Sequence, residues 1–123
     1  MIEYVDPDLA TGEWTWEWGA EGLEKNVTLY ASPASLLELQ ILVEAGRLRL
    51  RPGFSVEQLL DDSRWLLDDP PSADWFSSAV EIAWTRDPFD RLLVAHAALR
   101  GWRLATGDAH LATRLGSQRS LEL

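Results

Sequence analysis

The sequence predicts an α/β fold in which a parallel sheet is covered by helices. Short β-rich runs alternate with segments whose apolar residues recur at helical spacing, and this alternation is typical of parallel sheets. The chain has 123 residues, of which 46% are hydrophobic, and this is enough to bury one core without disulfides. We therefore expect a single domain over residues 1–123.

The first 26 residues differ from the rest of the chain. Trp14, Trp16 and Trp18 alternate with Thr15 and Glu17, and a period of two predicts a strand with one aromatic face. Residues 1–26 are therefore expected to form an atypical N-terminal segment.

Regular alternation of strands and helices begins after this segment. Residues 27–31 are a short β-rich run. Ser32 is a good N-cap and Pro33 suits the first helical position, so a helix is expected over residues 33–45. Residues 48–50 are expected to form either a short strand or an irregular link.

Two further helices are predicted in the middle of the chain. Ser55 and Gln58 have the spacing of a capping box, which predicts a helix to about Leu67. Two aspartates and two prolines then end that helix. Ser72 is the expected cap of the next helix, which should run to about Trp84.

The C-terminal part has the clearest helix signals. Asp87 is a natural N-cap, Pro88 suits the first helical position, and Gly101 is expected to end this helix. The remaining expected elements are a strand at 103–106, a short helix at 109–115 and an edge strand near Leu121.

Composition narrows the possible functions. The net charge of −9 argues against a protein that coats nucleic acid non-specifically, because such a protein needs a basic surface. It does not exclude a nuclease, because a carboxylate-rich metal site itself makes a chain acidic. The chain has no cysteine, no signal peptide and no apolar stretch long enough for a bilayer, so we expect a cytoplasmic protein that does not bind membranes.

Glu38 is the first acid that needs an explanation. It lies about 160° around its predicted helix from Gln40, away from the polar stripe, and its neighbours at helical spacing are apolar. A carboxylate there loses hydration unless something compensates. A buried ion pair with an arginine, an exposed helix edge and a metal ion are the open explanations.

Asp90 and Asp108 each have a local explanation as well as a chemical one. Asp90 is the third residue of its helix, where an acid favours the helix dipole and can bond back to the cap. Asp108 fits the N-cap of the helix that follows it. Three converging carboxylates can also hold a divalent ion, so both acids are candidates for a metal site.

The two histidines, His96 and His110, are not expected to be catalytic. Neither has the company of a catalytic triad in the sequence, and the chain has no cysteine nucleophile. We expect both side chains to be packed or solvated.

Three stretches, in this order and spacing, resemble the PIN-domain family and most of all its VapC-type toxin ribonucleases. They are Ser32–Leu39 (SPASLLEL), Arg86–Ala95 (RDPFDRLLVA) and Leu104–Asp108 (LATGD). The resemblance covers about residues 27–115. It implies a PIN-like parallel sheet flanked by helices, with the N-terminal third remodelled.

The resemblance also implies a chemistry. The family's acids fall on Glu38, Asp90 and Asp108, which would be the catalytic and metal-binding residues of an enzyme that hydrolyses RNA with Mg²⁺ or Mn²⁺. Arg86 or Arg91 would contact RNA phosphates, unless they are only surface or salt-bridge residues. An antitoxin protein as partner and a homodimer are further implications.

The N-terminus departs from the family, which opens with an apolar strand that ends in an aspartate followed by Thr or Ser. Asp6 is the candidate for this first acid and for a fourth metal ligand, but Pro7 replaces the hydroxyl residue. Either Asp6 completes a remodelled site or the site is incomplete.

Two functional hypotheses follow. The leading one is a metal-dependent endoribonuclease of the toxin–antitoxin type. The alternative is a non-catalytic PIN-like module that has an incomplete metal site and binds a protein partner through the tryptophan face.

Overall fold

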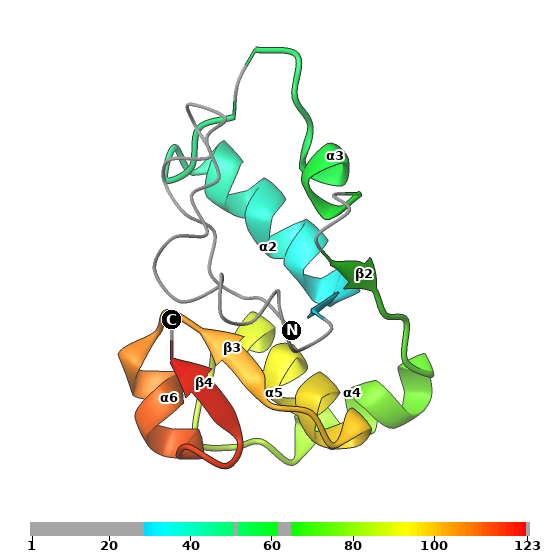
Figure 1. Cartoon of the computed structure of the whole chain (residues 1–123), viewed down its shortest axis with the longest axis vertical. Helices are drawn as coiled ribbons and strands as arrows, with labels where there is room; N and C mark the ends of the chain where they lie inside the picture. The colour runs from blue at the N-terminus through cyan, green and yellow to red at the C-terminus, as the bar shows by residue number, and fades with distance from the viewer. Residues whose placement is uncertain (1–28, 51, 62–64, 123) are drawn as a thin grey trace.

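Short parallel strands alternate with longer helices in a computed structural model that describes residues 29–50, 52–61 and 65–122. In chain order the elements are β1 (Tyr30–Ala31), α2 (Pro33–Glu44), α3 (Val56–Leu60), β2 (Leu66–Leu67), α4 (Ser72–Val80), α5 (Pro88–Arg100), β3 (Leu104–Thr106), α6 (Ala109–Leu115) and β4 (Ser120–Glu122). Helices α4, α5 and α6 gather with β3 and β4, while α2, α3 and β2 lie on the other side of the molecule (Figure 1). The tryptophan row at 14–18 lies outside the described residues.

The strands of the described residues form two separate parallel pairs. Strand β1 pairs with β2, so that Tyr30 lies opposite Leu66, and β3 pairs with β4, so that Leu104 lies opposite Ser120. The α/β class and the parallel pairing are therefore confirmed. Among the described residues, no strand joins the two pairs, so a single parallel sheet stays an expectation.

The C-terminal half agrees closely with the sequence. Helix α5 begins at Pro88, is capped by Asp87, and ends at Gly101, whose φ of +71° favours glycine. Strand β3, helix α6 and strand β4 form where they were expected. Residues 48–50 are an irregular link.

The prediction that the helix after Ser55 runs to about Leu67 is wrong. The capping box forms, but α3 ends at Leu60, and residues 66–67 form β2 instead. Backbone N–H groups in and just after β2 donate to the carbonyl oxygens of Leu29 and Ala31, both at 3.0 Å. Pairing with a distant strand therefore decides the conformation of an apolar run that fits either state locally.

Helix α4 also differs from the expectation. It begins at Ser72, but Pro71 occupies the N-cap position and makes no side-chain cap bond. The helix ends at Val80 and does not reach Trp84. The guanidinium carbon of Arg114 lies instead over the Trp84 ring, 5.2 Å from the ring centroid. Trp84 makes this contact from beyond the end of α4.

In the part of the chain that the structure describes, two apolar clusters hold these elements together. The larger one joins α4, α5, β3 and α6, and its most deeply buried side chains include Leu93, Leu104 and Leu111. Ala34 is the residue of α2 that belongs to it. The smaller cluster consists of Leu39, Leu48 and Val56.

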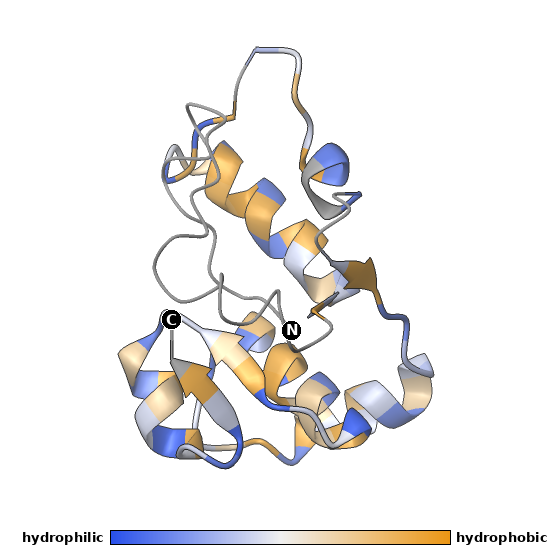
Figure 2. Cartoon of the chain, in the orientation of Figure 1, coloured by the Kyte–Doolittle hydropathy of each residue, from blue (hydrophilic) through white to orange (hydrophobic). Residues whose placement is uncertain are grey.

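Hydrophobic residues continue along α2 and onto β2, away from the larger cluster (Figure 2). Helix α2 is thus divided between two packing environments, with its first turn against α5 and its middle in the smaller cluster. None of the helices in the described ranges has the length and apolar content needed to cross a membrane.

Candidate metal site

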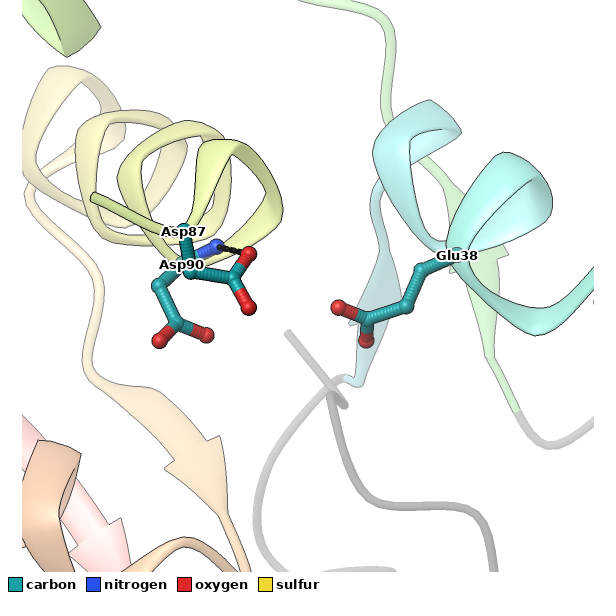
Figure 3. A group of neighbouring side chains, drawn as sticks. All are labelled: Glu38, Asp87 and Asp90. Carbon is teal, nitrogen blue, oxygen red and sulfur yellow. Dashed lines mark hydrogen bonds between the residues drawn. The ribbon is translucent and has the colours of Figure 1, made fainter. Parts of the chain in front are cut away.

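Three carboxylates from two helices converge between α2 and α5. Glu38 lies in the second turn of α2, Asp87 is the N-cap of α5, and Asp90 lies in the first turn of α5. Each offers one carboxylate oxygen, and these oxygens all lie within 4.8 Å of one another. Figure 3 shows Glu38 and Asp87 pointing toward each other from the facing helices, with the Asp90 carboxylate beside that of Asp87. We call these three residues the acidic cluster.

The start of α5 holds the Asp87 side chain of the acidic cluster in place. Oδ1 of Asp87 accepts hydrogen bonds from the backbone N–H groups of Phe89 (2.8 Å) and Asp90 (3.2 Å). The Asp87 N–H donates to Oγ1 of Thr85 (3.2 Å), whose carbonyl oxygen accepts from Nε of Arg91 (2.7 Å). The Asp87 N–H therefore bonds to Thr85, whereas a capping box would direct it toward the Asp90 side chain.

Glu38 is the member of the acidic cluster on α2, and like Asp90 it is partly buried. Burial raises the pKa of its carboxyl group from 4.5 to about 7, and the nearby negative charges of Asp87 and Asp90 add to the rise. Within the described residues, Glu38 forms no ion pair with an arginine or lysine. The ion-pair explanation left open by the sequence therefore does not apply within this part of the chain.

The structure does not bring every predicted site residue together. Asp108 lies just after β3 and caps α6, because its Oδ1 accepts from the backbone N–H groups of His110 (2.8 Å) and Leu111 (3.3 Å). It is not a member of the acidic cluster. Its role as a ligand stays a prediction. Asp6, the expected fourth ligand, lies outside the described residues.

Sequence reasoning missed Asp87 as a member of the acidic cluster. Its role as N-cap is a complete local explanation of an aspartate at this position. A signal was nevertheless present, because an N-cap aspartate uses one carboxylate oxygen for the cap and has a second oxygen for another partner. Asp87 also precedes Asp90 by three residues, a spacing that places both on the same side of a helix start.

The expectation that His96 has no triad-like company is wrong. Its Nδ1 lies 2.9 Å from Oγ of Ser32, and its Nε2 lies 2.6 Å from Oδ2 of Asp68. Ser32 and His96 are nevertheless both 0% exposed, so no substrate reaches the hydroxyl group. The other part of the expectation, that a histidine here is packed or solvated, is confirmed for His96, which is packed in the interior. His110 is exposed.

The donor set of the acidic cluster suits a hard divalent cation. All of its ligand atoms are carboxylate oxygens, which Mg²⁺ and Mn²⁺ prefer over softer ligands. The raised pKa of Glu38 shows that the three charges repel one another where the side chain has lost part of its hydration. A bound cation would offset this repulsion, so the residues present fit a metal ion.

Comparison with known proteins gives one match. Residues 10–114 match the family model described as the PIN domain. The match includes the whole acidic cluster and Asp108 but leaves out Asp6. No curated protein and no solved structure matches the chain.

Proposed function

Because this chain belongs to the PIN-domain family, we propose that it is a metal-dependent endoribonuclease of the toxin–antitoxin type. PIN domains are generally nucleases that use divalent metal ions, and they act on RNA. The observation that carries the proposal is the convergence of three carboxylates from α2 and α5 on one point. The proposed substrate is a phosphodiester bond of RNA, and the proposed ion is Mg²⁺ or Mn²⁺.

Glu38 and Asp90 are the proposed ligands that also match the family's acids, and Asp87 is added to them by its position in the acidic cluster. When bound, a divalent ion polarises the scissile phosphate, activates water and stabilises the leaving oxygen. The Asp87 carboxylate is preorganised for this task by the two backbone N–H groups that donate to its Oδ1. Asp108 and Asp6 are proposed as further acids of the site.

Arg86 is the better candidate for a contact with RNA. It is exposed and precedes the acidic cluster directly in the chain. Arg91 is half-buried, and its Nε donates a hydrogen bond to the carbonyl oxygen of Thr85, so part of its guanidinium group already has a partner. An exposed arginine beside the carboxylates would attract a phosphate that the net negative charge of the chain otherwise repels.

The direct test is substitution of Asp90→Asn, followed by a cleavage assay on fluorescently labelled single-stranded RNA with Mg²⁺ or Mn²⁺. We expect cleavage to be abolished while the far-ultraviolet circular dichroism spectrum is unchanged. Asp74→Asn is the matched control, because Asp74 is an exposed acid in the first turn of α4 and lies outside the acidic cluster. This control should cleave RNA like the unmodified protein.

Two results would count against the proposal. Equal cleavage by the unmodified protein and Asp90→Asn, in preparations free of contaminating nuclease, would show that Asp90 is not needed. Failure of the unmodified protein to bind Mn²⁺ by isothermal titration calorimetry would favour the non-catalytic interaction module instead.

The toxin role, the antitoxin partner and the homodimer are the finer parts of the proposal. They rest on the resemblance of three stretches to VapC-type ribonucleases and need their own tests. We expect induced expression to arrest bacterial growth, and Asp90→Asn to relieve the arrest. Light scattering after size exclusion should give twice the mass of the 13.9 kDa chain. Normal growth during induced expression would contradict the toxin role. A monomeric mass would contradict the homodimer.

A further inference from the structure

A buried hydrogen-bond chain through His96 connects the helices that carry the acidic cluster. His96 lies on α5 and is bonded on one side to Ser32, the N-cap of α2. On its other side it is bonded to Asp68, which follows β2 directly. Arg100, one turn further along α5, donates from Nε to Oδ2 of Asp68 (2.9 Å) and from Nη2 to Oδ1 (3.2 Å). These hydrogen bonds thus connect α2, α5 and the end of β2.

The partners of His96 determine its protonation state. The Asp68 carboxylate only accepts, so Nε2 carries the hydrogen of that bond. Oγ of Ser32 accepts from the Ala34 N–H (3.2 Å) and donates its own hydrogen to Nδ1. Every donor then has an acceptor, whereas a proton on Nδ1 would leave the Ser32 hydroxyl hydrogen without one. Burial lowers the pKa of His96 although Asp68 opposes the shift, in agreement with a neutral ring.

Within the described residues, little apolar side-chain packing joins α2 to α5. Ala34 is the member of α2 in the larger apolar cluster, and Leu39, farther along the helix, packs with Leu48 and Val56 instead. An alanine buries little area and restricts helix position weakly. The bond between Ser32 and His96 is directional, so it selects one separation and one orientation of the two helices.

The acidic cluster works against this arrangement. Glu38 on α2 is repelled by Asp87 and Asp90 on α5. In the protein without a bound ion, this repulsion favours separation of the two helices. Ser32 is fixed to α2 by its cap bond, and both Ser32 and His96 lie about 9 Å along their helices from the nearest member of the acidic cluster. The bond between these two residues therefore restrains the two helix backbones that carry the carboxylates.

We propose that His96 is a positioning residue, which holds α2 against α5 through Ser32 and so keeps Glu38 within reach of Asp87 and Asp90. The inference rests on the proposed metal site for its functional meaning. The helix geometry can nevertheless be tested without any metal. A ligand supported in this way keeps the precise placement that a metal site needs.

The first experiment measures the helix separation directly. The chain has no cysteine, so spin labels can be attached at Gln40→Cys on α2 and Ala98→Cys on α5, both at exposed positions. We expect a narrow distance distribution by double electron–electron resonance in the labelled parent without metal. His96→Ala should shift or broaden it, and His96→Gln, which retains a donor for Asp68, should do so less.

The second experiment measures Mn²⁺ affinity by isothermal titration calorimetry. We expect His96→Ala to weaken binding about tenfold or more. Leu111→Ala is the control for destabilisation, because Leu111 is buried in the same large cluster but lies on α6, away from the contact between α2 and α5. Its affinity should stay within about twofold of the parent value.

The outcomes separate the inference from the proposed function. An unchanged distance distribution in both His96 variants overturns the positioning role, whatever the metal affinity. An equal loss of affinity in His96→Ala and Leu111→Ala overturns it too, because general destabilisation would then suffice. A parent protein that binds no Mn²⁺ but whose helices separate in His96→Ala supports the positioning role and removes the proposed metal function.

Discussion

Glu38 of α2 and Asp87 at the start of α5 offer carboxylate oxygens within 4.8 Å of each other, although they are far apart in the sequence. Such a contact between like charges destabilises a protein unless a cation or a proton intervenes. The carboxyl group of Glu38, with a pKa of about 7, takes up the proton at mildly acidic pH. The same group is therefore expected to control both the stability and the metal affinity of this protein.

The first prediction concerns stability in the absence of metal. Because the pKa of Glu38 is higher in the folded protein than in the unfolded chain, the folded state binds more protons between pH 4.5 and about 7. The contribution of Glu38 to the free energy of unfolding must therefore fall as pH rises through this interval. The loss is at most about 3 kcal/mol, and solvent near this partly exposed group reduces it.

Glu38→Gln should remove this dependence and make the metal-free protein more stable at pH 8. Urea denaturation at pH 5 and pH 8, in the presence of a chelator, measures the free energy of unfolding of both proteins. Glu44→Gln is the matched control, since Glu44 is exposed on the same helix and bonds to Gln40. If Glu38→Gln and the parent lose the same stability between the two pH values, the repulsion within the acidic cluster is not significant.

The second prediction separates the two roles of Asp87. Asparagine is as good an N-cap as aspartate, so Asp87→Asn should keep the hydrogen bonds to Phe89 and Asp90 and leave α5 intact. It removes one negative charge from the acidic cluster. We expect the dissociation constant for Mn²⁺ to rise about tenfold, which corresponds to about 1.4 kcal/mol.

Calorimetric titration of Asp87→Asn with Mn²⁺, together with urea denaturation, checks this. Asp87→Ala should lose the affinity and, in addition, about 1 kcal/mol of stability, because alanine cannot cap. Unchanged affinity in Asp87→Asn would mean that Asp87 is a helix cap and nothing more.

The sequence predicted best where one local signal determines the structure. Asp87, Pro88 and Gly101 mark the ends of α5 by their own conformational preferences, and those ends are where they were expected. The same holds for α6, which Asp108 caps. These elements carry or adjoin two of the four predicted acids, Asp90 and Asp108.

Non-local contacts explain what the sequence did not reveal. Residues 66–67 form a strand because β1 is beside them, and no window around Leu67 contains that information. The bonds of His96 to Ser32 and Asp68 likewise join segments that the sequence does not relate. Glu38, Asp90 and Asp108 were predicted together through the family resemblance, and the acidic cluster contains the first two. Asp87 was missed because its role as N-cap already explained it locally.

Asp108 has a role as the N-cap of α6 and a proposed second role as an acid of the metal site, and substitutions at this position distinguish the two. Its Oδ1 already accepts two backbone hydrogen bonds at the start of α6, and an asparagine side-chain oxygen can replace it in both. If Asp108 also serves the reaction, the lost charge matters independently of the cap. We expect Asp108→Asn to keep its stability within a few tenths of a kcal/mol and to lose most RNA cleavage, while Asp108→Ala also loses about 1 kcal/mol. Cleavage rates compared with urea denaturation measure both effects, and parent-like cleavage by Asp108→Asn would leave Asp108 with a structural role alone.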